Sequence, residues 1–102
     1  MPEYPAITPA PGVTRQVLAQ TPEIMVVSFT FDAGAEGALH HHPHVQVTYV
    51  ESGRYAFTIA GQETTVGPGD SFVIPSGAPH GCRCIEGGRM IDTFTPRRDD
   101  FL

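Results

Sequence analysis

Residues 34–53 read GAEGALHHHPHVQVTYVESG and place three polar side chains on one short extended segment. Because side chains alternate between the two faces of a strand, His40 and His42 point the same way, about 6.5 Å apart along the chain. Gln46 has the same parity and joins them once Pro43 has bent the segment. Two imidazoles and an amide oxygen on one face are typical of part of a metal's coordination shell. The alternative is a solvated loop that is simply rich in histidine.

A second stretch, GDSFVIPSGAPH at residues 69–80, supplies a candidate for the remaining ligand. A turn, a short apolar strand and a second turn containing Pro75 and Gly77 lead to His80, which we expect at the start of a new strand. His80 is the only histidine outside the first stretch. If the first cluster binds a metal, His80 is therefore the histidine that can complete it.

Together the two stretches resemble the paired signatures of the cupin superfamily, in residue type and in spacing. The residues that carry the resemblance are Gly34, His40, His42, Gln46 and Gly53 in the first stretch and Gly69, Pro75, Gly77 and His80 in the second. The resemblance implies one divalent metal ion held by His40, His42, Gln46 and His80. Most cupins carry glutamate where this chain has Gln46, so the predicted site has three histidines, one neutral amide and no carboxylate.

Composition excludes several classes of function. The 102 residues are enough for one domain, with a formal net charge of −5 and six basic residues that are all arginine. The lack of lysine excludes Schiff-base chemistry, and no arginine cluster exceeds residues 97–98, so we expect no nucleic-acid partner. No apolar run approaches the roughly 20 residues needed to span a bilayer, and residues 1–12 lack the features of a secretory signal. We therefore expect a cytoplasmic protein without a membrane partner.

Short alternating segments predict an all-β chain. The segments lie at residues 13–19, 23–32, 46–50, 54–60, 63–66, 71–74, 80–85 and 89–95. No helical periodicity is present, and the chain contains 11 glycines, most of them between the segments. We predict a single jelly-roll barrel, which is also the double-stranded β-helix that the cupin resemblance implies.

Two further features complete the expected organisation. Residues 1–12 hold four of the ten prolines and predict an N-terminal arm, which leaves residues 13–102 as the cupin domain. The arm is either disordered or packed along a partner subunit, and exposed sheet edges favour a homodimer. Cys82 and Cys84 share a face and the parity of His80, so we expect them to point inward as structural residues, not as a disulfide.

The last stretch, MIDTFTPRRDDFL at residues 90–102, narrows the chemistry. Met90, Asp92 and Phe94 share one face of the last strand, so Asp92 is a candidate general acid/base near the metal. In a shifted register it would instead point into solvent. Arg98 could form a bidentate pair with a substrate carboxylate, or belong to a solvated terminus.

From about residue 25 to residue 102 the chain also resembles the KdgF family, the small cupins that ketonise unsaturated uronates in pectin and alginate breakdown. The resemblance is carried by the His-Xaa-His run followed by Gln46 and by the ending that contains Asp92, Phe94 and Arg98. It implies that those last three residues are catalytic or contact the substrate. The implied enzyme opens the ring of a small anionic sugar and ketonises it. The expected ligand set suits one ion of Ni, Zn, Fe, Mn or Co.

Two other functions fit the same residues. A metal-dependent dioxygenase would consume oxygen, whereas ketonisation would not. A non-catalytic cupin that binds a small acid or sugar would be favoured if Asp92 faced solvent.

Overall fold

Residues 3–102 are described by the structure, a computed structural model, and they fold into ten strands and one short 3-10 turn. Residues 1 and 2 of the expected N-terminal arm lie outside the described residues. No helix in residues 3–102 has the length and hydropathy needed to cross a bilayer. The elements are β1 (Ile7–Ala10), β2 (Val13–Thr21), β3 (Ile24–Phe31), β4 (Glu36–His40), β5 (Val45–Val50), β6 (Arg54–Ile59), β7 (Gln62–Val66), β8 (Ser71–Ile74), β9 (His80–Glu86), β10 (Gly88–Thr95) and the turn η1 (Asp99–Phe101).

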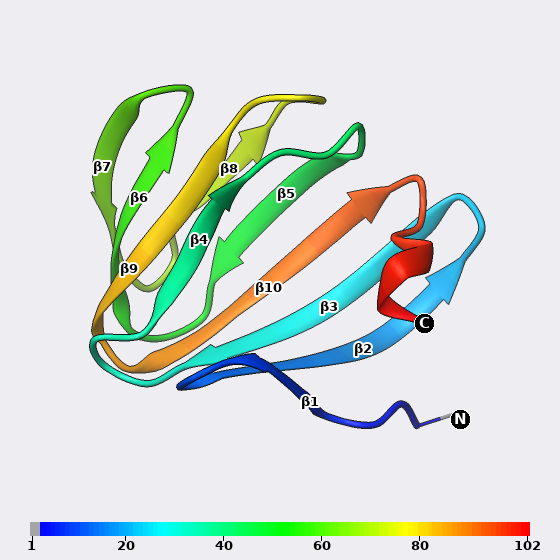
Figure 1. The fold of residues 1–102 in the computed structure, drawn as a ribbon, viewed down its shortest axis with the longest axis horizontal. Coiled ribbons are helices and arrows are strands. Elements are labelled where there is room, and N and C mark those ends of the chain that lie inside the picture. The colour runs from blue at the N-terminus through cyan, green and yellow to red at the C-terminus, as the bar shows by residue number, and fades with distance from the viewer. Residues whose placement is uncertain (1–2) are drawn as a thin grey trace.

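The strands form two antiparallel sheets. The larger sheet has the order β1-β2-β3-β10-β5-β8, and the smaller has the order β4-β9-β6-β7. Figure 1 shows the smaller sheet at the upper left and β10, β3 and β2 of the larger sheet at the lower right, with η1 beside the end of β10. This arrangement confirms the predicted all-β jelly-roll fold of one small domain.

Alternation along the central strands decides what faces the interior. On β3, Met25 and Val27 are fully buried and Phe31 is 5% exposed, as the alternating pattern predicts. β10 pairs with β3 so that Phe94 lies opposite Met25 and Asp92 opposite Val27. The same parity that buries apolar residues of β3 therefore turns Asp92 toward the interior.

The interior contains two hydrophobic clusters. The larger cluster consists of Val13, Phe31, Val50, Tyr55, Phe57, Val66, Ile74, Cys84 and Met90. The smaller consists of Val17, Met25, Val27 and Phe94. Members of both clusters border one cavity, whose wall includes most of the predicted site residues. The fold therefore surrounds these polar side chains with packed apolar residues.

The first strand, β1, was not expected. β1 pairs with β2 through Ile7 opposite Arg15 and Ala10 opposite Val13, although residues 1–12 show little strand pattern. β1 is an edge strand whose residues are largely exposed, so no apolar alternation marks it and Pro9 is tolerated there. The division into an arm (residues 1–12) and a domain (residues 13–102) stays a prediction.

Gly53 shows why glycine is needed in the first motif. It lies between β5 and β6, where the chain passes from the larger sheet to the smaller, and its φ is +89°. A Cβ atom at this position would lie 2.6 Å from the backbone oxygen of Glu86. Only glycine fits both the backbone angle and the space.

Candidate functional site

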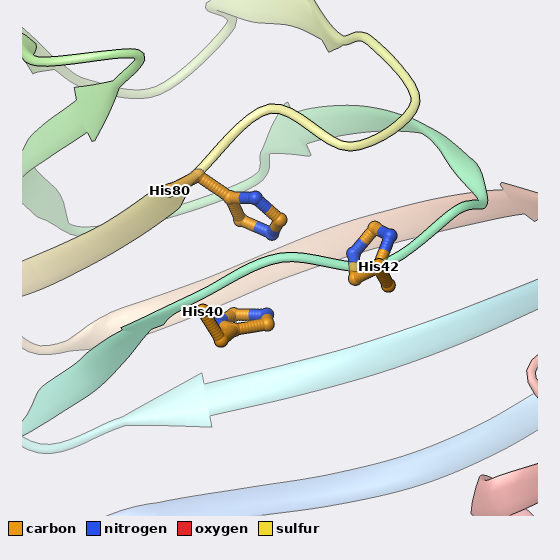
Figure 2. A group of neighbouring side chains, drawn as sticks. All are labelled: His40, His42 and His80. Atoms are coloured by element: carbon orange, nitrogen blue, oxygen red, sulfur yellow. The ribbon is translucent and has the colours of Figure 1, made fainter.

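Three histidine side chains converge where β4 and β9 run side by side (Figure 2). His40 ends β4 and lies directly opposite His80, the first residue of β9. His42 follows in the connection to β5. One potential ligand nitrogen from each ring lies within 4.8 Å of the others. The predicted histidines thus form a cluster that could hold a metal ion.

The backbone fixes the orientation of all three rings. Each Nδ1 faces a carbonyl oxygen two residues away, at 2.7 Å for His40 to Ala38, 3.1 Å for His42 to His44 and 2.9 Å for His80 to Ala78. Because a carbonyl oxygen can only accept, the neutral form of each ring carries its proton on Nδ1 and keeps a lone pair on Nε2. The buried Nε2 of His80 has no hydrogen-bond partner among residues 3–102. A metal ion would satisfy these lone pairs.

Gln46 adds an oxygen to this cluster. Its Nε2 donates to the Oγ1 of Thr48 at 3.0 Å, which turns its Oε1 toward the Nε2 of His42, 3.1 Å away. A neutral His42 lies between two acceptors, the backbone oxygen of His44 and this amide oxygen, and can donate to only one of them. A cation beside the second acceptor would remove the conflict. The four predicted ligands fit a metal ion on this ground.

Burial keeps two of the rings neutral. It lowers the pKa of His80 to about 4, and it lowers the pKa of His42, with a further contribution from the positive charge of Arg98. Metal ligation requires the neutral ring, so these shifts prepare both histidines for a ligand role at pH 7.

Asp92 lies at the end of a hydrogen-bonded chain that starts at Gln46, beside the histidines. It is 6% exposed and accepts a hydrogen bond of 2.6 Å from Thr48 Oγ1, its cross-strand neighbour on β5. Thr48 in turn accepts from Gln46. Burial raises the pKa of Asp92 to about 7, against the opposing effect of the hydrogen bond from Thr48. The carboxyl group is therefore able to hold or release a proton near neutral pH.

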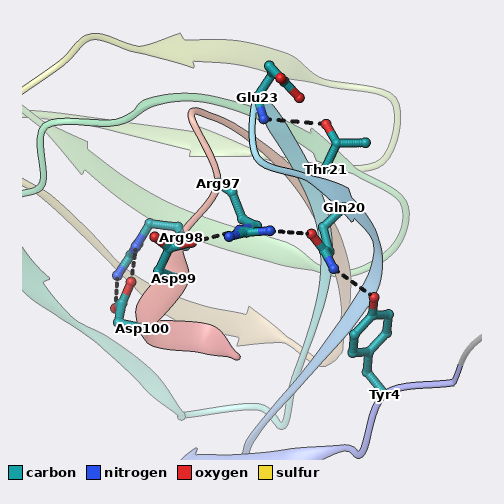
Figure 3. A network of polar contacts seen from close by, with 8 residues as sticks. All are labelled: Tyr4, Gln20, Thr21, Glu23, Arg97, Arg98, Asp99 and Asp100. Carbon is teal, nitrogen blue, oxygen red and sulfur yellow. Dashed lines mark hydrogen bonds and ion pairs between the residues drawn. The ribbon is translucent and has the colours of Figure 1, made fainter.

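Phe94 and Arg98 lie beside this chain. Phe94 is 1% exposed, pairs with Gln46 across β10 and β5, and makes an edge-on contact with the ring of His42. The side chain of Arg98 is 12% exposed and binds both carboxylate oxygens of Asp100, at 3.0 and 2.9 Å (Figure 3). Arg98 is thus held in a defined position, and does not belong to a solvated terminus.

A cavity of about 310 Å³ brings these groups together. Its wall includes His40, Gln46, His80, Asp92, Phe94 and Arg98, whereas His42 is not part of the lining. Most predicted site residues therefore face one space that is large enough for a small ligand.

Sequence reasoning missed three residues of this region. Thr48 connects Gln46 to Asp92 and is fully buried, and Arg15 and Phe101 line the cavity. Parity could have found two of them: Thr48 shares the face of Gln46, and Arg15 shares the face of the buried Val13 and Val17. Nothing in the sequence pattern places Phe101 inside.

The cysteines have different surroundings. Cys84 is 1% exposed and belongs to the larger hydrophobic cluster, whereas Cys82 lines the cavity. Burial raises the pKa of the Cys82 thiol to about 12 and also raises that of Cys84. Both thiols stay protonated at neutral pH and are poor metal ligands in that form.

Known proteins share both the sequence and the fold. Residues 27–94 match the family model described as "Cupin domain". The chain is 34% identical over 93 residues to the "Pectin degradation protein KdgF" of Dickeya dadantii (strain 3937), a match that covers 89% of this chain and 84% of that protein.

Two solved structures superpose on nearly the whole chain. KdgF from Halomonas sp. has a TM-score of 0.92 at 39% identity, covering 97% of this chain and 92% of the other. An RmlC-like cupin from Shewanella frigidimarina NCIMB 400 has a TM-score of 0.93 at 40% identity, covering 97% of this chain and 89% of the other.

Proposed function

Because the chain belongs to the cupin family and, within it, to the relatives of KdgF, we propose that it ketonises 4,5-unsaturated uronate monosaccharides by ring opening and tautomerisation. The curated relative is named for pectin degradation, which supports a sugar acid derived from pectin or alginate as the substrate. The observation that carries the proposal is the buried carboxyl group of Asp92 in the cavity that also contains His40 and His80.

The proposed metal ligands are His40, His42, Gln46 and His80, which carry no net charge when the rings are neutral. Ni, Zn, Fe, Mn and Co all accept imidazole and amide ligands, so we propose one such divalent ion. When bound, the ion would act as a Lewis acid that polarises substrate oxygen atoms and stabilises negative charge on them. The hydrogen bond from Gln46 to Thr48 would hold the amide oxygen toward the ion.

Asp92 would move the protons. Opening the hemiacetal ring converts C1 to an aldehyde and C5 to an enol, and ketonisation then transfers the enol proton to C4. No atom is gained or lost, so one carboxyl group can accept a proton from oxygen and return a proton to carbon. A pKa of about 7 leaves both forms of Asp92 available at neutral pH. Thr48 donates to one carboxyl oxygen, which leaves the other for the substrate.

Arg98 and Phe94 would position the sugar. The pair with Asp100 uses two of the five N–H groups of Arg98, so three remain for a substrate carboxylate. Phe94 would pack on the ring and exclude water from the reacting atoms. Together they would hold C4 near Asp92.

The proposed substrate has a C4–C5 double bond that is conjugated to its carboxylate and absorbs ultraviolet light. The experiment that tests this function follows the loss of that absorbance. The purified, metal-loaded protein should remove the absorbance faster than buffer does, without consuming oxygen. A chelated sample and Asp92→Asn should lose at least about 100-fold in rate, the range of one general acid/base. The matched control Asp32→Asn, at an exposed carboxylate outside the cavity lining, should retain wild-type activity. If the wild type removes the absorbance no faster than buffer does, the unsaturated uronate is not its substrate.

We also propose a cytoplasmic homodimer. The two unpaired thiols, Cys82 and Cys84, fit a reducing compartment.

The outer face of β5 and β8 exposes four apolar side chains, Val45, Val47, Tyr49 and Val73. A second copy would cover such a face. Sedimentation of the wild type should give twice the monomer mass, and Val47→Lys should shift it toward the monomer.

A further inference from the structure

Arg15 is a charged residue on the inward face of β2. Its neighbours on that face, Val13 and Val17, are 4% and 5% exposed, and Arg15 itself is partly buried and lines the cavity. Burying a cation away from water is unfavourable unless other groups compensate for the lost hydration. The position therefore needs an explanation that the proposed roles of Asp92, Phe94 and Arg98 do not supply.

The charge of Arg15 is not neutralised by a close ion pair. Within residues 3–102, no carboxylate oxygen lies within 4.0 Å of its guanidinium nitrogens. Burial lowers the pKa of Arg15, and the nearby Arg98 lowers it further, against the opposing influence of Asp100. An arginine stays protonated at neutral pH despite such shifts, so the cavity wall carries a cation available to a ligand.

Phe101 brings Arg15 and Arg98 to the same part of the cavity. The guanidinium carbon of Arg15 lies 4.1 Å from the centroid of the Phe101 ring, and that of Arg98 lies 4.2 Å from the same centroid. Cation–π contacts of this length stabilise both guanidinium groups without neutralising them. Arg98 has Asp100 as a partner, whereas Arg15 contacts the Phe101 ring and has no carboxylate partner among residues 3–102, so Arg15 has more hydrogen-bonding capacity left for an anion.

The C-terminal segment that carries Arg98 is hydrogen-bonded to β2, the strand that also carries Arg15, and Figure 3 shows the two residues that make this link, Arg97 and Gln20. Arg97, next to Arg98, donates to the Oε1 of Gln20 at 2.9 Å, and Gln20 Nε2 donates to the hydroxyl of Tyr4 at 3.0 Å. Gln20 lies on β2, the strand that also carries Arg15. The C-terminal segment is therefore attached to the strand of the second arginine.

We propose that Arg15 and Arg98 form a two-arginine clamp for the carboxylate of the substrate, and that Arg15 determines the preference for sugar acids over neutral sugars. The inference rests on the proposed function, because it assigns a residue to recognition of that substrate. Arg15 contributes the guanidinium without a carboxylate partner, and Asp100 orients the one that has such a partner.

The test uses the metal-loaded protein and two kinds of ligand. Calorimetry compares an unreactive saturated hexuronate with the corresponding neutral hexose, and turnover is followed with the unsaturated uronate. Arg15→Gln should lose roughly 10- to 100-fold in affinity for the hexuronate, as expected for one charge-assisted contact, with binding of the hexose unchanged. KM should rise by a similar factor while kcat changes less than about threefold, because uniform binding is removed.

Two further variants keep the test interpretable. Arg15→Lys retains the charge and should recover part of the preference for the acid, which a purely structural role would not predict. Arg83→Gln removes an exposed arginine outside the cavity lining and should behave like the wild type.

The possible results test the proposed two-arginine clamp and the proposed ketonisation independently of each other. If the wild type turns over the unsaturated uronate and Arg15→Gln keeps its full preference for hexuronate over hexose, the clamp is wrong and the proposed function stands. If the wild type shows no turnover but its preference for hexuronate depends on Arg15, the clamp stands and ketonisation is wrong.

Discussion

Burial shifts the pKa of Asp92 and the pKa of His80 in opposite directions. It disfavours the charged form of each, and so raises the pKa of the carboxyl group to about 7 and lowers that of the imidazole to about 4. At neutral pH a large fraction of Asp92 is protonated and His80 is neutral. The same apolar surroundings thus prepare one residue for proton transfer and the other for metal binding.

The shift of Asp92 makes the stability of the metal-free protein depend on pH. Its pKa is about 7 in the folded state and near 3.8 in the unfolded state, so between these values the folded state binds more protons. Stability contributed by Asp92 therefore falls as pH rises through this window. Asp92→Asn cannot titrate, so its free energy of unfolding relative to wild type should increase from pH 4 to pH 8.

The size of this effect is bounded by about 1.4 kcal/mol per pKa unit, hence by about 4 kcal/mol in total. Urea unfolding of both metal-free proteins at several pH values measures it. A difference between variant and wild type that stays constant from pH 4 to pH 8 would show that Asp92 is not shifted.

Gln46 offers a second prediction at the level of one residue. Gln46→Glu would add a negative charge beside the metal and replace the amide that donates to Thr48. A partly neutralised ion stabilises negative charge on the substrate less, so we expect kcat to fall about tenfold or more. Metal content, measured by mass spectrometry, should stay near one ion per chain. Unchanged turnover at full metal content would show that the neutral ligand set has no functional importance.

Among the elements, η1 and the residue before it contribute Phe101 and Arg98 to the cavity wall. Arg97 joins this segment to β2 through Gln20, and it also pairs with Asp99. Arg97→Ala should release the segment that carries Arg98 and Phe101. We expect KM for the uronate to rise roughly three- to tenfold, while the free energy of unfolding falls by about 1 kcal/mol or less.

The matched control for that element is Arg89→Ala. It removes an exposed ion pair with Glu51 and leaves the C-terminal segment in place. The two variants should differ in KM, measured by steady-state kinetics. Their stabilities, measured by thermal unfolding, should be similar. Equal KM values would mean that the attachment of the segment to β2 does not position the substrate.

Most strands could be predicted from the sequence because burial follows an alternating pattern. The strand at residues 71–74 is observed as Ser71–Ile74, and the segments at residues 23–32 and 89–95 correspond to β3 and β10. β1 was missed because an exposed edge strand has no apolar face to reveal it. The hydrogen bond from Thr48 to Asp92 could not be predicted, because it depends on the register between β5 and β10.

For the site, the sequence reasoning and the family resemblance contributed different residues. Spacing placed His40 and His42 on one face, His80 was the only histidine outside their stretch, and the cupin resemblance joined it to them. The bidentate pair of Arg98 with Asp100 depends on the turn η1, which has no periodic signal in three residues. The alternation along β2 is enough to place Arg15 on the inward face. Its proposed role in substrate binding could be inferred only from the cavity that it lines.

At the scale of the whole molecule, metal binding should be coupled to stability. The four proposed ligands come from β4, the connection after it, β5 and β9, so one ion would join both sheets. Binding to the folded state alone contributes about 3 kcal/mol when free metal is 100 times its Kd. For a domain of this size, that raises Tm by roughly 10 °C or more.

Removal of the metal with a chelator should reverse this gain. His80→Ala should show no metal-dependent change in Tm, whereas His41→Ala, at an exposed histidine outside the cluster, should respond like the wild type. Thermal unfolding with and without metal measures both. If metal raises the Tm of His80→Ala as much as that of the wild type, His80 is not a metal ligand.

The most direct measurement is the reaction of the unsaturated uronate in deuterium oxide, with the product analysed by nuclear magnetic resonance. Proton transfer from a carboxyl group fixed in the cavity predicts an open-chain ketone with deuterium on one face of C4, formed by the wild type and not by Asp92→Asn. Deuterium on both faces of C4, formed at the rate seen in buffer, would contradict the role of Asp92 and of the site built around it.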